Sequence, residues 1–232
     1  MCGRYTISSS LVEIRDLFHI DSGTSNIINI EPRYNVAPTH FVPVVHASNK
    51  RNELMSSCWG LNTPWSHSNK KTGKLINARS ETLHCKAAFR EAFKTRRCLI
   101  PANGYYEWTT EDGRKNQPWL IHPQHEKLFA FAGIWETYTN MDGKIFTAFA
   151  IVTTKASPLI GHIHHRMPVI VSIKNYATWL SAPASELFSI LKPYSKPICL
   201  HRVSNRVNNV SNDDKNLLAP VSQKIPAQLS LL

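Results

Sequence analysis

Hydrophobic residues recur with a helical period in only a few short stretches of the chain. The apolar and charged residues of Leu11–Phe18 are spaced as they are in an amphipathic helix. Ser10 and Glu13 stand at capping-box spacing at its start. The sequence therefore predicts a short helix here, and it predicts further helical segments over residues 86–93, 176–180 and 186–191.

Most other hydrophobic residues fall in short runs that are rich in β-branched and aromatic side chains. Turn-forming clusters such as GRKNQP and NMDGK separate these runs, which is typical of antiparallel strands. The regular strand–helix alternation of a doubly wound sheet is not seen, so we predict one α+β domain over residues 1–210. Residues 211–232 are polar and then interrupted by proline, and we expect them to form a peripheral tail. The predicted strands are 41–45, 58–61, 99–101, 105–109, 119–121, 129–135 and 146–153.

The composition is that of a globular protein with a basic surface. Of the 232 residues, 42% are hydrophobic and 19% are charged, and 27 Lys and Arg against 16 Asp and Glu give a net charge of +11. Such an excess favours a polyanionic partner, of which nucleic acid is the commonest, although a basic surface kept for solubility is the alternative. No apolar run approaches the roughly 18 residues that cross a bilayer, and the start lacks the layout of a secretory signal. We expect a cytoplasmic, nucleoid-associated protein without membrane contact.

The five cysteines are scattered and form no CxxC pair. This pattern argues against a disulfide framework and against a zinc ribbon, and it favours a reducing compartment. The sequence therefore predicts neither a metal nor a cofactor. The cysteines are Cys2, Cys58, Cys85, Cys98 and Cys199.

Cys2 is the first residue with distinctive chemistry. Removal of Met1 leaves an α-amine and a thiol on one residue, and about 10–20% of such an amine is unprotonated at pH 7. The amine can attack an aldehyde to give a Schiff base, and the thiol can then close a five-membered thiazolidine ring. The alternative is a cysteine that stands second without a role.

Three internal segments add candidate groups. In the stretch INARSET, Asn77 and Arg79 lie on one face if the segment is extended, and they suit a carbonyl and a phosphate respectively. Glu107 stands among aromatic residues, which would raise its pKa and suit acid–base work, although a surface acid is the plain alternative. His164 lies in the stretch HIHHRMP, where no ligand set for a metal is complete and a general acid or base is the better interpretation.

Six short motifs occur in the order in which they occur in one known family. They are CGRY at the start, RYNVAP at 33–38, Trp59-Gly60, INARSET at 76–82, ANGYYEW at 102–108 and HHRMP at 164–168. The sequence thus resembles the SRAP family of SOS-response-associated peptidases, or abasic-site processing proteins. The resemblance covers residues 2 to about 210. It implies a single domain in which antiparallel sheets form a barrel-like core with flanking short helices.

The resemblance also implies a function. Such proteins bind single-stranded DNA as monomers and crosslink their N-terminal cysteine to abasic sites as a thiazolidine, which shields the lesion. Autoproteolytic removal of the leader and an AP-lyase-like activity go with the family. Carried over, Cys2 is the nucleophile, Asn77 positions the sugar, Glu107 steers proton transfer and His164 promotes ring opening and reversal. The implied DNA contacts are Arg4, Asn35, Pro38, Trp65, Arg79, Thr153 and Arg166.

One departure and one charge pattern bear on DNA binding. Relatives often carry two adjacent aromatics after the Trp-Gly segment, whereas Ser66 follows Trp65 here. Base stacking contributes about 1–3 kcal/mol per base, so the change would weaken binding or alter junction preference. Two basic runs, residues 70–79 and 86–97, flank the Asn77 segment, where a DNA backbone needs neutralising. The alternative for each run is a solvated basic face.

Two other classes of function stay open at this stage. One is an N-terminal-nucleophile peptidase or amidohydrolase, in which Cys2 forms a thioester and Asn77 belongs to an oxyanion hole. The other is a non-catalytic module that binds single-stranded DNA through charge and stacked aromatics alone. The latter predicts no covalent product with abasic DNA.

Overall fold

The computed structural model describes residues 2–21, 30–49, 51–62, 73–111, 114–140 and 142–221. Its centre is a closed barrel of five strands. The strands pair in the ring β10–β4–β3–β6–β9 and back to β10, so the barrel has no free edge along this path. They are β3 (Phe41–Ser48), β4 (Arg51–Trp59), β6 (Arg97–Ala102), β9 (Phe129–Thr139) and β10 (Ile145–Lys155). The predicted α+β class with a barrel-like core is confirmed.

Three short strands extend the barrel sheet where its long strands continue beyond the ends of their neighbours. β11 (Arg166–Pro168) pairs with β10, and β12 (Ile170–Val171) pairs with β9. β5 (Asn77–Arg79) lies parallel to β10, just beyond the point where β4 also pairs with β10 in parallel. The predicted sheets were antiparallel, and these two parallel pairs are the exception. Local sequence patterns do not specify them, because the paired segments are about 70–90 residues apart.

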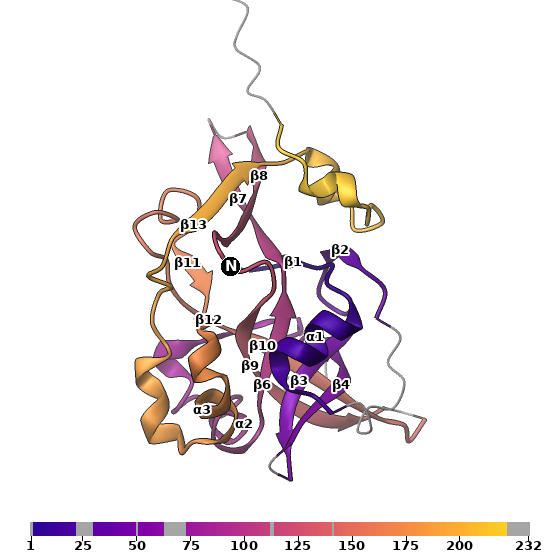
Figure 1. The fold of residues 1–232 in the computed structure, drawn as a ribbon, viewed down its shortest axis with the longest axis vertical. Helices are drawn as coiled ribbons and strands as arrows, with labels where there is room; N and C mark the ends of the chain where they lie inside the picture. The colour runs from indigo at the N-terminus through magenta and orange to yellow at the C-terminus, as the bar shows by residue number, and fades with distance from the viewer. Residues whose placement is uncertain are drawn as a thin grey trace, which may run out of the picture.

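A second sheet of five strands packs against the barrel, in the order β13–β8–β7–β1–β2 (Figure 1). All its pairs are antiparallel. The first strand of the chain lies inside this sheet rather than at its edge. In Figure 1 the marked start of the chain falls in the middle of the view. The strands are β1 (Arg4–Ile7), β2 (Arg33–Val36), β7 (Gly104–Glu111), β8 (Arg114–Pro123) and β13 (Ile198–Arg202).

Aromatic side chains join the second sheet to the barrel. The Tyr5 ring contacts Trp59 and Phe131 edge-on, with ring centroids 5.3 and 5.9 Å apart. All three side chains are fully buried. Gly133 in β9 allows β6 to approach, because a Cβ there would lie 2.7 Å from both Cys98 Sγ and the Ile100 side chain. The strand β1, which begins two residues after Cys2, is therefore anchored directly on the barrel wall.

The helices are short and lie on the outside. α1 (Leu11–Phe18) has the predicted capping box, and its buried Phe18 stacks on Tyr176 with centroids 5.1 Å apart. α3 (Tyr176–Ser181) also agrees with its prediction. The helix predicted over 86–93 begins later, as α2 (Arg90–Thr95), because residues 83–89 form turns around the pocket described below. The 3-10 turns are η1 (Ser80–Thr82), η2 (Ile173–Asn175), η3 (Ala184–Ser189), η4 (Asn205–Asn208) and η5 (Lys215–Leu218).

The segment after residue 210 contacts the second sheet as far as the structure describes it. Asp213 accepts hydrogen bonds from the backbone N–H groups of Tyr34 and Asn35 and pairs with Arg33. Leu217 in η5 is fully buried. Residues 211–221 thus cover β2, although we expected a peripheral tail. The division of the chain at residue 210 stays a prediction.

Arg97 was part of the second basic run, but it faces inward. Its side chain donates to the carbonyl oxygens of Phe93 and Lys94 at the end of α2. It also donates to those of Trp179 and Ala182 at the end of α3, each at 2.6 Å. The residue is only 6% exposed, so one guanidinium closes the ends of two helices and is not available to DNA.

We expect Arg97→Leu to lower the free energy of unfolding by about 3–5 kcal/mol, because buried carbonyl groups at two helix ends lose their donors. Arg96→Leu is the matched control, since Arg96 makes a partly exposed ion pair with Glu136, and such pairs contribute about 0–1 kcal/mol. Chemical denaturation followed by circular dichroism measures both. Equal effects of the two substitutions would contradict the assigned role.

Candidate active site at the buried start of the chain

Cys2 lies immediately before β1 and is fully buried. β1 pairs with β7 on one side and with β2 on the other, which holds the start of the chain within the sheet. Burial raises the pKa of the Cys2 thiol well above its ordinary value, and the negative charge of Glu107 raises it further. The thiol is therefore protonated at neutral pH, and it needs a proton acceptor before it can act as a nucleophile.

Asn77 reaches Cys2 from the barrel. Its strand, β5, is held against β10 by the pairing of Asn77 with Ile151. The Asn77 amide nitrogen donates a hydrogen bond of 2.9 Å to the carbonyl oxygen of Cys2. Its amide oxygen is buried and has no hydrogen-bond partner within the described part of the chain. Asn77 thus holds the backbone of Cys2 and keeps an acceptor for a further donor.

Glu107 lies on β7, next to the residue that pairs with Arg4. Only 3% of it is exposed. Burial raises the pKa of the Glu107 carboxyl to about 7, although the positive amino terminus and the Trp108 backbone N–H oppose the rise. Both protonation states are therefore populated near neutral pH, as a group that takes up and returns protons requires.

His164 stands just before β11 and is half-buried. Its Nδ1 accepts a hydrogen bond of 2.9 Å from the backbone N–H of Arg166. Burial lowers the pKa of His164, and the positive amino terminus lowers it further. The neighbours His162 and His165 are exposed, and His165 stacks on His164 with centroids 4.4 Å apart. Electrostatic effects thus connect His164 and Glu107 to the start of the chain.

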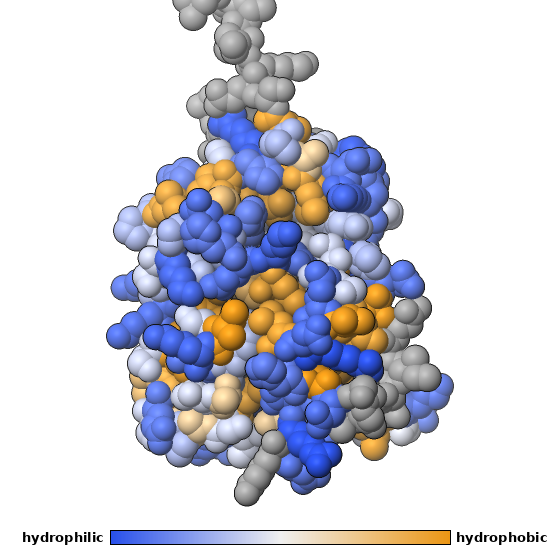
Figure 2. Space-filling model, in the orientation of Figure 1, coloured by the Kyte–Doolittle hydropathy of each residue, from blue (hydrophilic) through white to orange (hydrophobic). Residues whose placement is uncertain are grey.

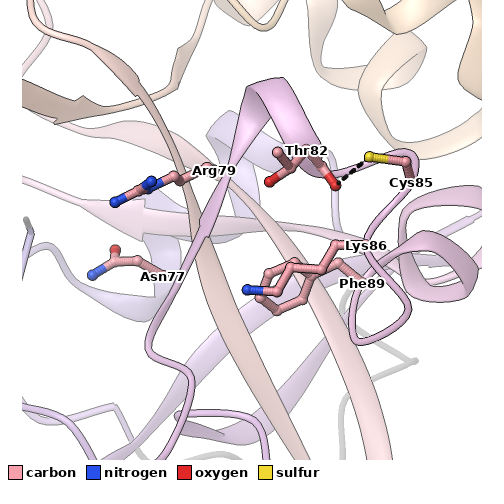
Figure 3. Close-up of a pocket in the computed structure, with 6 residues that line it drawn as sticks. All are labelled: Asn77, Arg79, Thr82, Cys85, Lys86 and Phe89. Atoms are coloured by element: carbon pink, nitrogen blue, oxygen red, sulfur yellow. Dashed lines mark hydrogen bonds between the residues drawn. The ribbon is translucent and has the colours of Figure 1, made fainter.

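A basic pocket lies beside Asn77 and has a volume of about 620 Å³ (Figure 3). Asn77, Arg79 and Lys86 point their polar ends the same way into it. The ammonium of Lys86 lies over the ring of Phe89, 5.3 Å from its centroid. No acidic side chain is among the six described residues that line the pocket, which suits an anion. These residues are Asn77, Arg79, Thr82, Cys85, Lys86 and Phe89.

Figure 2 shows the surroundings of the site on the face that Figure 1 presents. Hydrophobic side chains gather in the middle of this face, close to the marked start of the chain, and hydrophilic side chains frame them. Among the described residues no three or more His, Cys, Asp and Glu side chains are grouped as metal ligands would be. Within the same residues, no helix has the length and apolar character needed to span a membrane.

The side chains of Arg4 and Asn35 form hydrogen bonds to other groups of the protein. Arg4 donates to Asn35 Oδ1 at 2.8 Å and to the Val207 carbonyl oxygen at 2.7 Å. Asn35 is fully buried, and its amide nitrogen donates to the carbonyl oxygens of Val207, Asn209 and Asn212. These bonds tie β1 and β2 to the segment after β13. Their expected contact with DNA stays a prediction, and the packing favours a structural role.

Two further predicted DNA contacts are also buried. Thr153 is fully buried in β10, and 7% of Arg166 is exposed. Arg166 is held by Glu81 in a bidentate ion pair, with distances of 2.6 and 2.9 Å. We did not single out Glu81 from the sequence, although it belongs to the INARSET stretch. Pro38 is half-buried after β2, whereas Trp65, Lys70 and Lys71 lie outside the described residues.

Comparisons with known proteins give one consistent answer. The family model SRAP, described as SOS response associated peptidase, matches residues 1–210. The abasic site processing protein YoqW of Bacillus subtilis is 36% identical over 222 residues, which cover 94% of this chain and 99% of that protein. The abasic site processing protein YedK of Escherichia coli is 29% identical over 228 residues, which cover 95% and 100%.

Solved structures agree with the sequence relatives. The crystal structure of a protein from Bacteroides thetaiotaomicron matches with a TM-score of 0.83 at 26% identity, covering 95% of this chain and 100% of that one. A Bordetella bronchiseptica protein matches with a TM-score of 0.74 at 25% identity. The buried cysteine at the start of the chain, the barrel and the family match over residues 1–210 together show that the chain belongs to the SRAP family.

Proposed function

We propose that this protein processes abasic sites in single-stranded DNA by forming a covalent crosslink through Cys2. Relatives that match nearly the whole chain are named abasic site processing proteins. The observation that carries the proposal is the burial of Cys2, with Asn77 on its carbonyl oxygen and the charge of Glu107 acting on its thiol. An aminothiol held in this way suits an aldehyde, which is the reactive form of an abasic deoxyribose.

The chemistry starts with the loss of Met1, by the protein itself or by an aminopeptidase. The free α-amine of Cys2 attacks the aldehyde carbon of the ring-opened sugar to give a hemiaminal. Loss of water leaves an imine, and the thiol sulfur then adds to the imine carbon while its proton passes to the nitrogen. The net reaction joins one aldehyde and one aminothiol into a thiazolidine and releases one water molecule.

The surrounding groups have separate tasks in this scheme. Asn77 fixes the Cys2 backbone, and its unpartnered amide oxygen is an acceptor for the hydroxyl of the hemiaminal or of the sugar. Glu107, with a pKa of about 7, takes the thiol proton and supplies one to the departing water. His164 contacts the sugar during ring opening. AP-lyase-like strand cleavage would follow from the imine if the thiol fails to trap it.

The phosphates next to the lesion would occupy the pocket beside Asn77. Arg79 and Lys86 are exposed there, and the pocket is continuous with the residue that holds Cys2. A backbone bound in this pocket brings its sugar to the amine without base contacts, so binding is independent of sequence. Of the second basic run, Lys86 belongs to this surface, whereas Arg97 is buried and stabilises the fold.

The first test is the product itself. Intact mass spectrometry of the protein, before and after incubation with abasic single-stranded DNA, should show a protein without Met1 and then an adduct that has lost one water molecule. Cys2→Ala keeps an amine, so it should form an imine that borohydride traps but no stable adduct. A variant that retains Met1 should form no stable adduct either, because its α-amine and the Cys2 thiol lie on different residues. A stable crosslink in either variant contradicts the aminothiol mechanism.

The second prediction concerns Glu107 and pH. Its folded pKa of about 7 lies above the unfolded value, so the carboxyl costs stability as pH rises from about 4.5 to 7. Glu107→Gln should therefore increase the free energy of unfolding at pH 8 by about 2–3 kcal/mol more than at pH 4. Denaturant titrations at both pH values measure this difference, with Glu53→Gln on the barrel as a partly exposed control.

The same substitution tests proton transfer. In the wild type, the single-turnover rate of crosslinking should change around pH 7, where Glu107 titrates. Glu107→Gln should remove that inflection and slow the reaction by about 10²–10⁴-fold. An unchanged pH–rate profile would assign the proton transfer to another group.

The third prediction concerns salt. Each phosphate contact to a single strand contributes a slope of about −0.7 in a plot of log K against log salt concentration. Arg79→Ala should reduce the slope by about that amount, because the exposed Arg79 lines the pocket beside Asn77. Lys192→Ala, in a different pocket that Asn77 does not line, should leave the slope unchanged. Fluorescence anisotropy at several salt concentrations gives both slopes.

A further inference from the structure

Arg166 connects three strands of the extended barrel sheet. It begins β11, which pairs with one edge of β10, while β5 pairs with the other edge of β10. The Arg166 side chain donates to the Thr153 carbonyl oxygen on β10 at 2.6 Å and continues to Glu81, just after β5. Neighbouring strands lie about 4.8 Å apart, so the side chains of Arg166 and Glu81 together bridge roughly 10 Å of sheet. The strand β5, which carries Asn77, and the strand β11, which follows His164, are thereby tied together.

Glu81 fixes the far end of Arg166. Both carboxylate oxygens of Glu81 accept from the guanidinium, Oε1 at 2.6 Å and Oε2 at 2.9 Å, which is the fork-to-fork geometry with the greatest directional constraint. The Arg166 side chain is 8% exposed and the Glu81 side chain is 42% exposed. The hydrogen bonds from Arg166 lower the pKa of Glu81, so the pair stays ionised at neutral pH.

The backbone of Arg166 in turn determines the state of His164. The Arg166 N–H can only donate, so the Nδ1 atom that accepts from it at 2.9 Å carries a lone pair. In a neutral imidazole the proton then sits on Nε2. The same Nδ1 lies 3.2 Å from the Arg166 carbonyl oxygen, which would be its partner in the other tautomer. The Arg166 backbone thus presents a donor and an acceptor to the same ring nitrogen, and the donor is the nearer of the two.

We infer that Glu81 is a positioning residue, which holds Arg166 across β10 and so keeps His164 in the neutral Nε2–H tautomer. This inference rests on the proposed function for the substrate that His164 meets. In this tautomer His164 presents a hydrogen-bond donor to an oxygen of the sugar and does not remove a proton from it. It stabilises charge on that oxygen during ring opening, and Glu107 carries the proton transfers.

The wild-type protein gives the first test. A long-range ¹H–¹⁵N correlation spectrum reports which ring nitrogen of each histidine is protonated, and His164→Ala identifies the His164 signals. We expect an unprotonated Nδ1 and a protonated Nε2 at pH 7. A protonated Nδ1 on His164 overturns the inference. This readout does not depend on crosslinking, so it also decides the matter if the protein forms no adduct and the proposed function fails.

The second test is Glu81→Gln compared with Glu136→Gln. Both remove one carboxylate from an ion pair with arginine, but Glu136 lies on β9 and its partner is Arg96, at the end of α2. Glu81→Gln should mix the His164 tautomers and slow single-turnover crosslinking by about 10–100-fold, since small displacements of a reacting group have effects of this size. The Kd for an uncleaved abasic analogue should change less than twofold in both variants.

Glu136→Gln should keep the wild-type tautomer and rate. A Glu81→Gln protein that crosslinks at the wild-type rate with an unchanged His164 spectrum overturns the positioning role. Equal slowing in the two variants overturns it as well, because the effect would then belong to the loss of any carboxylate. Circular dichroism establishes whether both variants are folded. If Glu81→Gln is not folded, the ¹H–¹⁵N spectrum of the wild type still decides the tautomer.

Discussion

The structure depends on the burial of the chain's first strand. β1 lies between β7 and β2, and its Tyr5 side chain packs on Trp59 and Phe131 of the barrel. The first residues of most domains are poorly ordered unless something ties them down. Here backbone pairing on both edges and an aromatic contact do so. The reactive residue of the proposed mechanism is therefore fixed at its place before any DNA binds.

Burial of the start also sets the electrostatics of the site. Desolvation favours the neutral form of each group. The pKa of Cys2 and that of Glu107 therefore rise, and the pKa of His164 falls. A buried carboxyl that must ionise near pH 7 costs stability, and the aromatic core around β1 offsets that cost. The shifted pKa values of these groups and the well-packed fold thus arise from the same burial.

Arginine side chains have four different placements in this basic protein. Arg97 closes two helix ends, Arg4 joins the first strands to the C-terminal segment, and Arg166 spans β10 to Glu81. Arg79 is exposed in the pocket beside Asn77. Net charge therefore overstates the surface available to DNA, because part of it is used for internal hydrogen bonds. The proposed binding of DNA phosphates rests on fewer residues, which lie next to Asn77.

The sequence by itself determined the local features of this protein. The capping box at Ser10, parts of seven strands, the α+β class and the family motifs follow from residues that are neighbours along the chain, whereas β1, β2, β5, β11, β12 and β13 were not predicted. Only the tertiary structure decided the parallel pairing of β5 with β10, the approach of Asn77 to Cys2, the ion pair of Arg166 with Glu81 and the inward direction of Arg97. Each of these joins segments far apart in sequence, and their distances depend on the closure of the barrel. A residue pattern shows which chemistry is present, but packing determines which groups meet and which charges remain accessible.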